Sequence, residues 1–222
     1  MFPFPFSFFG AEAEAPELEL IDNDFAMEFD AGNSEYISAG NPTELQITGD
    51  ITISAWFKTT ATNFGAIIDK GYYYVNGSLS YRLYLRGSGQ GVGFDYYGGN
   101  TVGTRVYAQY TVAQNDGEWH HLVGVKSGSS SILYLDGAQV ATGVGTQAAI
   151  YNSSENFTIG ASSNNTTHFD GDIDEIAVWN KALELADIQT IYNATNDNPG
   201  KCANLWSGGL GTGLVYWNRM GD

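Results

Sequence analysis

The sequence has few cationic residues and a single cysteine, and these shortages exclude several kinds of protein. Nine Lys and Arg stand against 25 Asp and Glu, which gives a formal net charge of −16. A basic surface of the kind that binds nucleic acid or anionic lipid is therefore not expected. With Cys202 as its one cysteine, the chain cannot form an intrachain disulfide or a thiolate metal cluster. Core packing must hold the fold, and the thiol is expected to be inert.

Catalytic signatures are also missing. The motifs G-x-S-x-G and H-E-x-x-H and a phosphate-binding loop do not occur. Retaining glycosidases need two carboxyl groups about 5–5.5 Å apart, which alternate residues on one strand face can supply. Asp172, Asp174 and Glu175 come nearest to such an alternation, but they do not complete it, because Ile176 stands where the last carboxylate would. His120 and His121 are adjacent, so they lie on opposite faces of a strand and cannot act as a pair. The sequence predicts a protein that is not an enzyme.

Glycine and aromatic residues are abundant. The 28 Gly, 14 Tyr, 12 Phe and 5 Trp give short aromatic or β-branched runs separated by turn residues, as in β-sandwiches and jelly rolls. A length of 222 residues suits one large all-β domain. Strands are expected near Leu18, Ile51, Ala66, Tyr81, Val92, Arg105, Glu118, Ile132, Asn156, Ile173 and Leu214. The one expected helix spans residues 183–193, where Leu185, Ile188 and Tyr192 share a face.

The most regular local pattern predicts a β-hairpin. Residues 116–125 read DGEWHHLVGV, and residues 133–140, LYLDGAQV, return as a second alternating strand. Asp136 and Gly137 are placed for a tight turn that needs positive φ. Together with the other regular strands, this hairpin predicts a core that includes Trp56, Trp119, Val123, Leu135, Ile159 and Ile176.

The hairpin resembles the DGxWHHVAxV and LYVDGxxV strands of laminin-G-like domains, in the concanavalin A-like lectin and glucanase superfamily. Further segments match in the family's order, and they read AMEFDAGNSEYI (26–37), DITISAWFKT (50–59), FTIGAS (157–162) and FDGDIDEIAVWNKALE (169–184). The resemblance implies an all-β fold, a two-sheet antiparallel jelly-roll sandwich with one short helix. We expect residues 17–222 to form this sandwich, including a strand at the C-terminus.

The same resemblance implies a calcium site. Laminin-G-like domains often bind one calcium ion near their opening and closing strands, and the matching positions here are Asp30 and Asp174. Asn33 and Asp170 are close enough in sequence to contribute oxygen ligands. The alternative is local capping, in which Asp30 and Asn33 form Asx turns and Asp174 accepts backbone amides.

Tyrosines cluster in two segments between Gly and Asn residues. Tyr72, Tyr73 and Tyr74 form one group, and Tyr96 and Tyr97 form the other. Aromatic faces can stack on sugar rings, so these residues are candidate glycan contacts. Packing between neighbouring strands is the alternative for the same rings.

The first 16 residues do not fit the sandwich pattern and are expected to form a separate extended arm. Residues 1–10 read MFPFPFSFFG, which lacks the basic start and the uninterrupted apolar run of a signal peptide and is too short to cross a membrane. Its aromatic residues, expected to bind a neighbouring subunit, are Phe2, Phe4, Phe6, Phe8 and Phe9. The arm thus predicts an oligomer or a larger assembly.

Two functions are compatible with these features. The first is a structural protein of an extracellular assembly, with a phage virion favoured because residues 213–222, GLVYWNRMGD, resemble segments found beside laminin-G-like modules in marine phage virions. In that case the arm would bind other protein subunits. The alternative is a carbohydrate-binding module of a bacterial surface or secreted protein, with glycans as partners.

Overall fold

The computed structural model describes residues 17–71, 80–88 and 91–221. In these ranges most strands belong to two antiparallel sheets. The first sheet has seven strands, β2 (Met27–Phe29), β4 (Ile51–Lys58), β9 (Trp119–Ser127), β10 (Ser130–Leu135), β11 (Ala138–Val144), β13 (Gly171–Trp179) and β15 (Leu214–Asn218). The second has six, β3 (Ile37–Gly40), β5 (Gly65–Lys70), β6 (Tyr81–Leu85), β7 (Val92–Tyr97), β8 (Arg105–Tyr110) and β12 (Phe157–Ile159).

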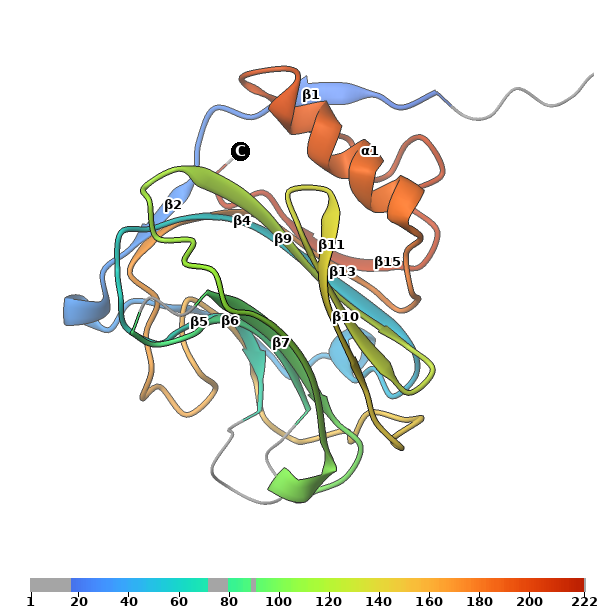
Figure 1. Ribbon diagram of the computed structural model, residues 1–222. Helices are drawn as coiled ribbons and strands as arrows, with labels where there is room; N and C mark the ends of the chain where they lie inside the picture. The colour runs from blue at the N-terminus through green and yellow to red at the C-terminus, as the bar shows by residue number, and fades with distance from the viewer. Residues whose placement is uncertain (1–16, 72–79, 89–90, 222) are drawn as a thin grey trace, which may run out of the picture.

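A third layer covers part of the seven-stranded sheet on its outer side (Figure 1). It consists of α1 (Leu185–Asn196) and a small sheet in which β1 (Leu20–Asp22) pairs with β14 (Lys201–Ala203). Three short 3₁₀ helices lie in loops, η1 (Ala31–Asn33), η2 (Thr43–Leu45) and η3 (Val102–Thr104). No helix among the described residues is long and apolar enough to cross a membrane.

The order of strands in the two large sheets is that of a jelly-roll sandwich, as the sequence predicts. The seven-stranded sheet runs β11-β10-β9-β4-β13-β15, with β2 also paired to β13, and the six-stranded sheet runs β3-β12-β5-β6-β7-β8. The predicted hairpin is formed by β9 and β10. At the next turn Asp136 and Gly137 have φ values of 49° and 73°, as a primed hairpin turn requires.

The main core lies between the two sheets. Alternate residues of β4 and β9, such as Phe57 and Leu122, point inward and are fully buried with Ile176 and Ile159. Burial of each such side chain stabilises the fold by roughly 1.5–3 kcal/mol. Of the predicted core residues Trp56, Val123, Leu135, Ile159 and Ile176 are buried.

Trp119 corrects the predicted core, because its side chain is 38 % exposed. It is the first residue of β9 and lies on the outer face of the sheet, in line with His121 and Val123. The helix covers Val123 but not Trp119. The alternation of β9 predicted from sequence is correct. The sequence does not show how far α1 extends over the outer face of the sheet.

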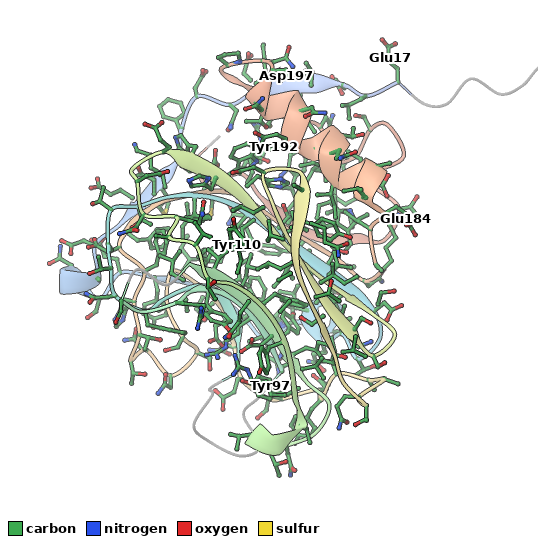
Figure 2. All side chains as sticks on the ribbon, in the orientation of Figure 1. Glu17, Tyr97, Tyr110, Glu184, Tyr192 and Asp197 are labelled. Atoms are coloured by element: carbon green, nitrogen blue, oxygen red, sulfur yellow. The ribbon has the colours of Figure 1, made fainter. Side chains whose placement is uncertain are left out.

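A second core lies between α1 and the outer face of the seven-stranded sheet. Ile188 and Ile191 of the helix pack here with Val123, Val125 and Trp179 of the sheet. The helix was expected over residues 183–193, and it begins two residues later and ends three residues later. Figure 2 shows Tyr192 below the helix, on the side of the sheet. Leu185, which was expected on the buried face, is 42 % exposed because it lies in the first turn.

A bulge interrupts β13 at a position that matters for the outer face. Against β4, Asp174 pairs with Trp56 and Ala177 pairs with Ser54, so β13 has one extra residue. Glu175 lies in this bulge and has a φ of 48°, a left-handed conformation that non-glycine residues seldom adopt. As a result the consecutive carboxylates of Asp174 and Glu175 both lie on the outer side.

Candidate functional site

A cleft of about 630 Å³ lies between the outer face of the seven-stranded sheet and the loops that join the third layer to it. Its lining combines three aromatic rings with acidic, amide and hydroxyl side chains. The lining residues are Asn23, Asp24, Phe25, Ala26, Trp56, Glu118, Trp119, Asp174, Thr195, Asn196, Pro199, Gly200 and Lys201. A volume of this size is typical of small-molecule sites, about 300–1,000 Å³.

Trp56 forms an aromatic surface in the depth of the cleft, with only 7 % of its area exposed. Its ring stacks on His121, with centroids 5.0 Å apart, and on Tyr192 of α1 at 5.8 Å. The ring of His121 is held in turn by the hydroxyl of Ser54, which lies 2.8 Å from its Nε2. The indole therefore has one orientation, set by β4, β9 and the helix.

Phe25 and Trp119 form the exposed aromatic part of the cleft, and 64 % and 38 % of their surfaces are accessible. They lie at two sides of it, since Phe25 precedes β2, which pairs with β13, whereas Trp119 begins β9, which pairs with β4 on the other side of β13. The Nζ of Lys58 lies 5.8 Å from the ring centroid of Trp119 and 3.2 Å from Asp172, which holds the indole against the sheet. Exposed rings at two sides of a cleft are available to the apolar face of a ligand.

Asp174 is the fixed polar group of the cleft. Its Oδ2 accepts a hydrogen bond from Nδ2 of Asn23 at 3.0 Å, and its Oδ1 accepts one from the backbone N–H of Glu175 at 2.8 Å. The second bond depends on the bulge, because the left-handed backbone of Glu175 turns that N–H toward the preceding side chain. Asp174 is 5 % exposed, and its carboxylate has little freedom to reorient.

Glu175 supports the cleft from below. Its carboxylate accepts hydrogen bonds from Nε1 of Trp217 at 2.6 Å, from Nε of Arg219 at 3.2 Å and from Sγ of Cys202 at 3.4 Å. Burial raises the pKa of Glu175 and raises the pKa of the Cys202 thiol to about 12. The thiol therefore stays protonated at neutral pH, in agreement with the inert role expected from the sequence.

The loop that carries Asn23 and Phe25 is held at its start. Arg219 donates to the backbone carbonyl of Asp22, and Lys201 forms an ion pair with the Asp22 carboxylate. The backbone N–H of Asn23 donates to the carbonyl of Gly200 at 3.0 Å. Arg219 follows β15, so the last described residues reach the start of this loop. One wall of the cleft is thus built from the two ends of the described chain.

The opposite wall, which carries Glu118 and Trp119, is held by His120. The imidazole lies between two carboxylates, with Nδ1 2.8 Å from Asp136 and Nε2 3.2 Å from Asp116. The hydrogen bond to Asp136 is the main reason why the pKa of His120 is raised. Asp116 also accepts the backbone N–H of Glu118 at 3.0 Å. Through these two contacts the His120 side chain fixes the loop that leads into β9.

The pKa of the neighbouring His121 is shifted in the opposite direction. Its ring is completely buried, and burial lowers its pKa to about 4. In the unfolded chain its pKa is about 6.5, so the folded protein binds fewer protons than the unfolded one between these values.

The two histidines give a pH prediction with opposite signs. The contribution of neutral His121 is present above pH 6.5 and is lost as the pH falls toward 4, by up to about 1.4 kcal/mol per pH unit. We expect His121→Gln to show a shallower loss of unfolding free energy than the wild type between pH 6.5 and 4.5 in urea titrations. For His120→Gln, the loss of unfolding free energy relative to the wild type should be largest below pH 6.5. This loss should shrink as the pH rises through the raised pKa of His120. Parallel pH curves for wild type and both variants would contradict these assignments.

The residues predicted to bind calcium do not all meet. Asp30 caps η1, accepting the N–H of Gly32 at 2.7 Å and Nδ2 of Asn33 at 2.8 Å. β2 pairs with β13 from Phe29 opposite Gly171, so Asp30 and Asp170 lie at the same end of that pairing. Asp174 lies four residues farther along β13, roughly 13 Å away at strand spacing, and faces the cleft instead.

These contacts are those of the capping alternative. Among the described residues, no three His, Cys, Asp or Glu side chains form a group that could hold a metal ion. Calcium binding between the Asp30 loop and the Asp174 strand stays a prediction. If calcium binds there, the melting temperature of the protein should rise with added calcium and fall with a chelator.

The predicted tyrosine contacts divide into two groups. Tyr72, Tyr73 and Tyr74 lie outside the described residues. Tyr96 and Tyr97 are 0 % and 1 % exposed in β7 and do not line the cleft, and Figure 2 shows Tyr97 far from α1. The hydroxyl of Tyr96 donates to the carbonyl of Gln147 at 2.9 Å. Their burial corrects the expectation that these two rings stack on a ligand and matches the packing alternative.

The arm residues Phe2, Phe4, Phe6, Phe8 and Phe9 also lie outside the described residues. Their binding to a neighbouring subunit stays a prediction.

Comparison with known proteins gives the family. A model of the concanavalin A-like lectin/glucanases superfamily matches residues 31–189, which is most of the chain. The chain belongs to this superfamily. No curated protein sequence matches it significantly.

Solved structures share the sandwich at low sequence identity. A protein described as carbohydrate binding, from Bacteroides ovatus ATCC 8483, has a TM-score of 0.64 and 16 % identity over 91 % of this chain and 53 % of its own. Thus the chain spans about half the length of that protein. Domain 4 of AbnA, a GH43 extracellular arabinanase from Geobacillus stearothermophilus solved with arabinotriose, has a TM-score of 0.55 and 15 % identity over 80 % of this chain and 82 % of its own.

The CBM40 domain of the Ruminococcus gnavus IT-sialidase, solved with α2,3 sialyllactose, has a TM-score of 0.57. It is 15 % identical over 78 % of this chain and 98 % of its own. At these identities the likeness establishes the shared fold.

Part of the cleft lies outside the residues that match the superfamily model. Trp56, Trp119 and Asp174 fall within residues 31–189, but the wall formed by residues 23–26 and the wall formed by residues 195–201 do not. The cleft therefore combines residues of the matched segment with residues outside it. Trp119 and Asp174 lie in segments that resemble those of the family, whereas residues 23–25 and 195–201 do not. The alternation of β9 places Trp119 on the face that lines the cleft.

Proposed function

We propose that this chain is a carbohydrate-binding domain that holds a short oligosaccharide in the cleft between Phe25 and Trp119. The observation that carries the proposal is the combination of two exposed rings with fixed oxygen and amide groups in one cleft. Sugar rings present an apolar C–H face that packs on aromatic rings and hydroxyls that need hydrogen-bond partners.

The chemistry of the lining fits this division. Trp56 and the two exposed rings supply apolar surface, while Asp174, Asn196 and Thr195 offer hydrogen-bonding groups within the same cleft. Both walls and the deep surface are fixed before any ligand binds, which lowers the entropy cost of association. Support also comes from the fold neighbours solved with saccharides.

The proposed function is binding without catalysis. The bulge brings Asp174 and Glu175 to one side of β13, but Glu175 is 6 % exposed and its carboxylate is surrounded by Trp217, Arg219 and Cys202. A hydrolase of the retaining type needs two carboxyl groups that reach the scissile bond from the two sides. An extracellular or cell-surface location is part of the same proposal.

The comparisons give no support to the phage virion role suggested by the C-terminal segment. That segment is instead part of the domain, since β15 pairs with β13 and Arg219 holds the cleft wall. We therefore favour carbohydrate binding over the structural role.

The test is a glycan microarray probed with the purified, labelled chain, followed by calorimetry on the best saccharide. We expect binding to a restricted set of oligosaccharides with a micromolar to millimolar Kd. Absence of binding to every saccharide on the array, by a chain shown to be folded, would contradict the proposal.

A further inference from the structure

We propose that the cleft selects its saccharide by charge, taking neutral oligosaccharides and discriminating against those that carry a carboxylate. This inference rests on the proposed function and concerns the same cleft. It names the class of saccharide rather than the identity of its sugars.

The lining of the cleft is acidic. Its ionisable residues are three carboxylates, Asp24, Glu118 and Asp174, and one amine, Lys201. Asp24 and Glu118 are exposed at the two walls, and Asp174 lies in the depth between them. A bound ligand would therefore have carboxylates on three sides. The chain as a whole adds a formal charge of −16 to this local field.

The cations around the cleft are already paired with carboxylates. Lys201 pairs with Asp22, and Lys58, beside Trp119, pairs with Asp172 at 3.2 Å. Arg219, behind the loop of Asn23, lies 3.2 Å from Glu175. A ligand carboxylate would have to compete with these partners for a positive charge, and it would lose its hydration shell in doing so.

Hydroxyl groups suit the same lining. A carboxylate only accepts hydrogen bonds, so Asp24 and Glu118 can take the O–H donors of a neutral sugar while the rings pack on its C–H face. A ligand carboxylate has no O–H to donate and brings a like charge. At about 7 Å in water each like-charge pair disfavours binding roughly threefold, and the lining carries a net excess of two. We expect a neutral saccharide to bind about five- to tenfold more tightly than its carboxylated counterpart at low salt.

The experiment compares matched pairs of saccharides by calorimetry and on the microarray. The probes are lactose with 3′-sialyllactose, and xylotriose with the same trisaccharide carrying a glucuronic acid branch. Each pair is measured at 50 mM and 500 mM NaCl, because salt screens the repulsion between exposed charges. The variants are Glu118→Gln, which removes one charge of the lining, and Glu44→Gln, which removes one exposed charge in η2, outside the lining.

The proposal predicts that the neutral member binds more tightly and that the ratio of affinities falls at high salt. In Glu118→Gln the ratio should fall by roughly threefold, whereas in Glu44→Gln it should stay at the wild-type value. Equal affinities, a preference for the carboxylated member, or a ratio that does not change in Glu118→Gln would overturn the charge selection and leave carbohydrate binding in place. If neither member of either pair binds, and the array shows no other saccharide bound, the proposed function fails together with this inference.

Discussion

Replacing Trp119 by alanine is expected to weaken saccharide binding at least tenfold. The indole is 38 % exposed and forms one side of the cleft, opposite Phe25. Truncating a central aromatic contact of this kind typically costs about 2 kcal/mol or more of binding free energy. Calorimetric titration of wild type and variant with the same saccharide measures the change. The variant should remain folded, because the ring is not part of either core and loses mainly its contact with Lys58.

Trp206→Ala is the matched control for this prediction. Trp206 is a second tryptophan with a large exposed fraction, 63 %, and it does not line the cleft. Its removal should leave saccharide affinity within about a factor of two, since surface substitutions outside a site are usually close to neutral. An equal loss of affinity in both variants, or an unchanged affinity in Trp119→Ala, would argue against the cleft as the binding site.

The second large effect is expected on stability, from Asp95→Asn. The Asp95 carboxylate is fully buried on β7 and accepts hydrogen bonds from Arg82 at 2.8 Å, from Arg105 at 2.8 Å and from the Tyr84 hydroxyl at 2.8 Å. The amide keeps the size of the side chain but removes the charge that balances two guanidinium groups of low exposure. Breaking a buried ion pair in this way typically costs about 3–5 kcal/mol. Urea unfolding at pH 7 measures the loss.

Asp172→Asn provides the comparison, because it makes the same chemical change in an ion pair that solvent reaches. Lys58 and Asp172 lie 3.2 Å apart with 41 % and 29 % of their side chains exposed. Such a pair is worth about 0–1 kcal/mol, so this variant should be nearly as stable as the wild type. Similar losses of unfolding free energy in the two variants would mean that the buried ion pairs of Asp95 stabilise the fold no more than the exposed pair of Asp172.

The fold follows from sequence because its signals are local and repeated. The DGEWHHLVGV and LYLDGAQV segments alternate with period two, and in the structure they form β9 and β10 with the positive-φ turn at Asp136. The family resemblance then orders the remaining strands. The last strand was also predicted, because Leu214 to Asn218 alternate. In the structure this strand pairs with β13.

The cleft does not follow from sequence because it depends on one exception to alternation and on contacts between distant residues. Strict alternation would place Asp174 and Glu175 on opposite faces, and the bulge puts both outside. No local signal shows that Arg219 reaches Asp22 or that Asn23 reaches Asp174, because the residues of each pair lie more than 150 positions apart. Trp119 was assigned to the core because large aromatics usually lie there, and only the extent of α1 shows that it stays exposed.

The most direct test of saccharide binding in this cleft is a ¹H–¹⁵N NMR titration that follows the five tryptophan indole signals. The titrant is the saccharide selected on the microarray. Two indoles, those of Trp56 and Trp119, line the cleft, whereas those of Trp179, Trp206 and Trp217 do not. Our account predicts that the Trp56 and Trp119 signals shift in a saturable manner with the Kd found by calorimetry, while the other three stay within a small fraction of that shift. Saturable shifts at Trp206 or Trp217 without any at Trp119 would show that the saccharide binds elsewhere and would contradict the account.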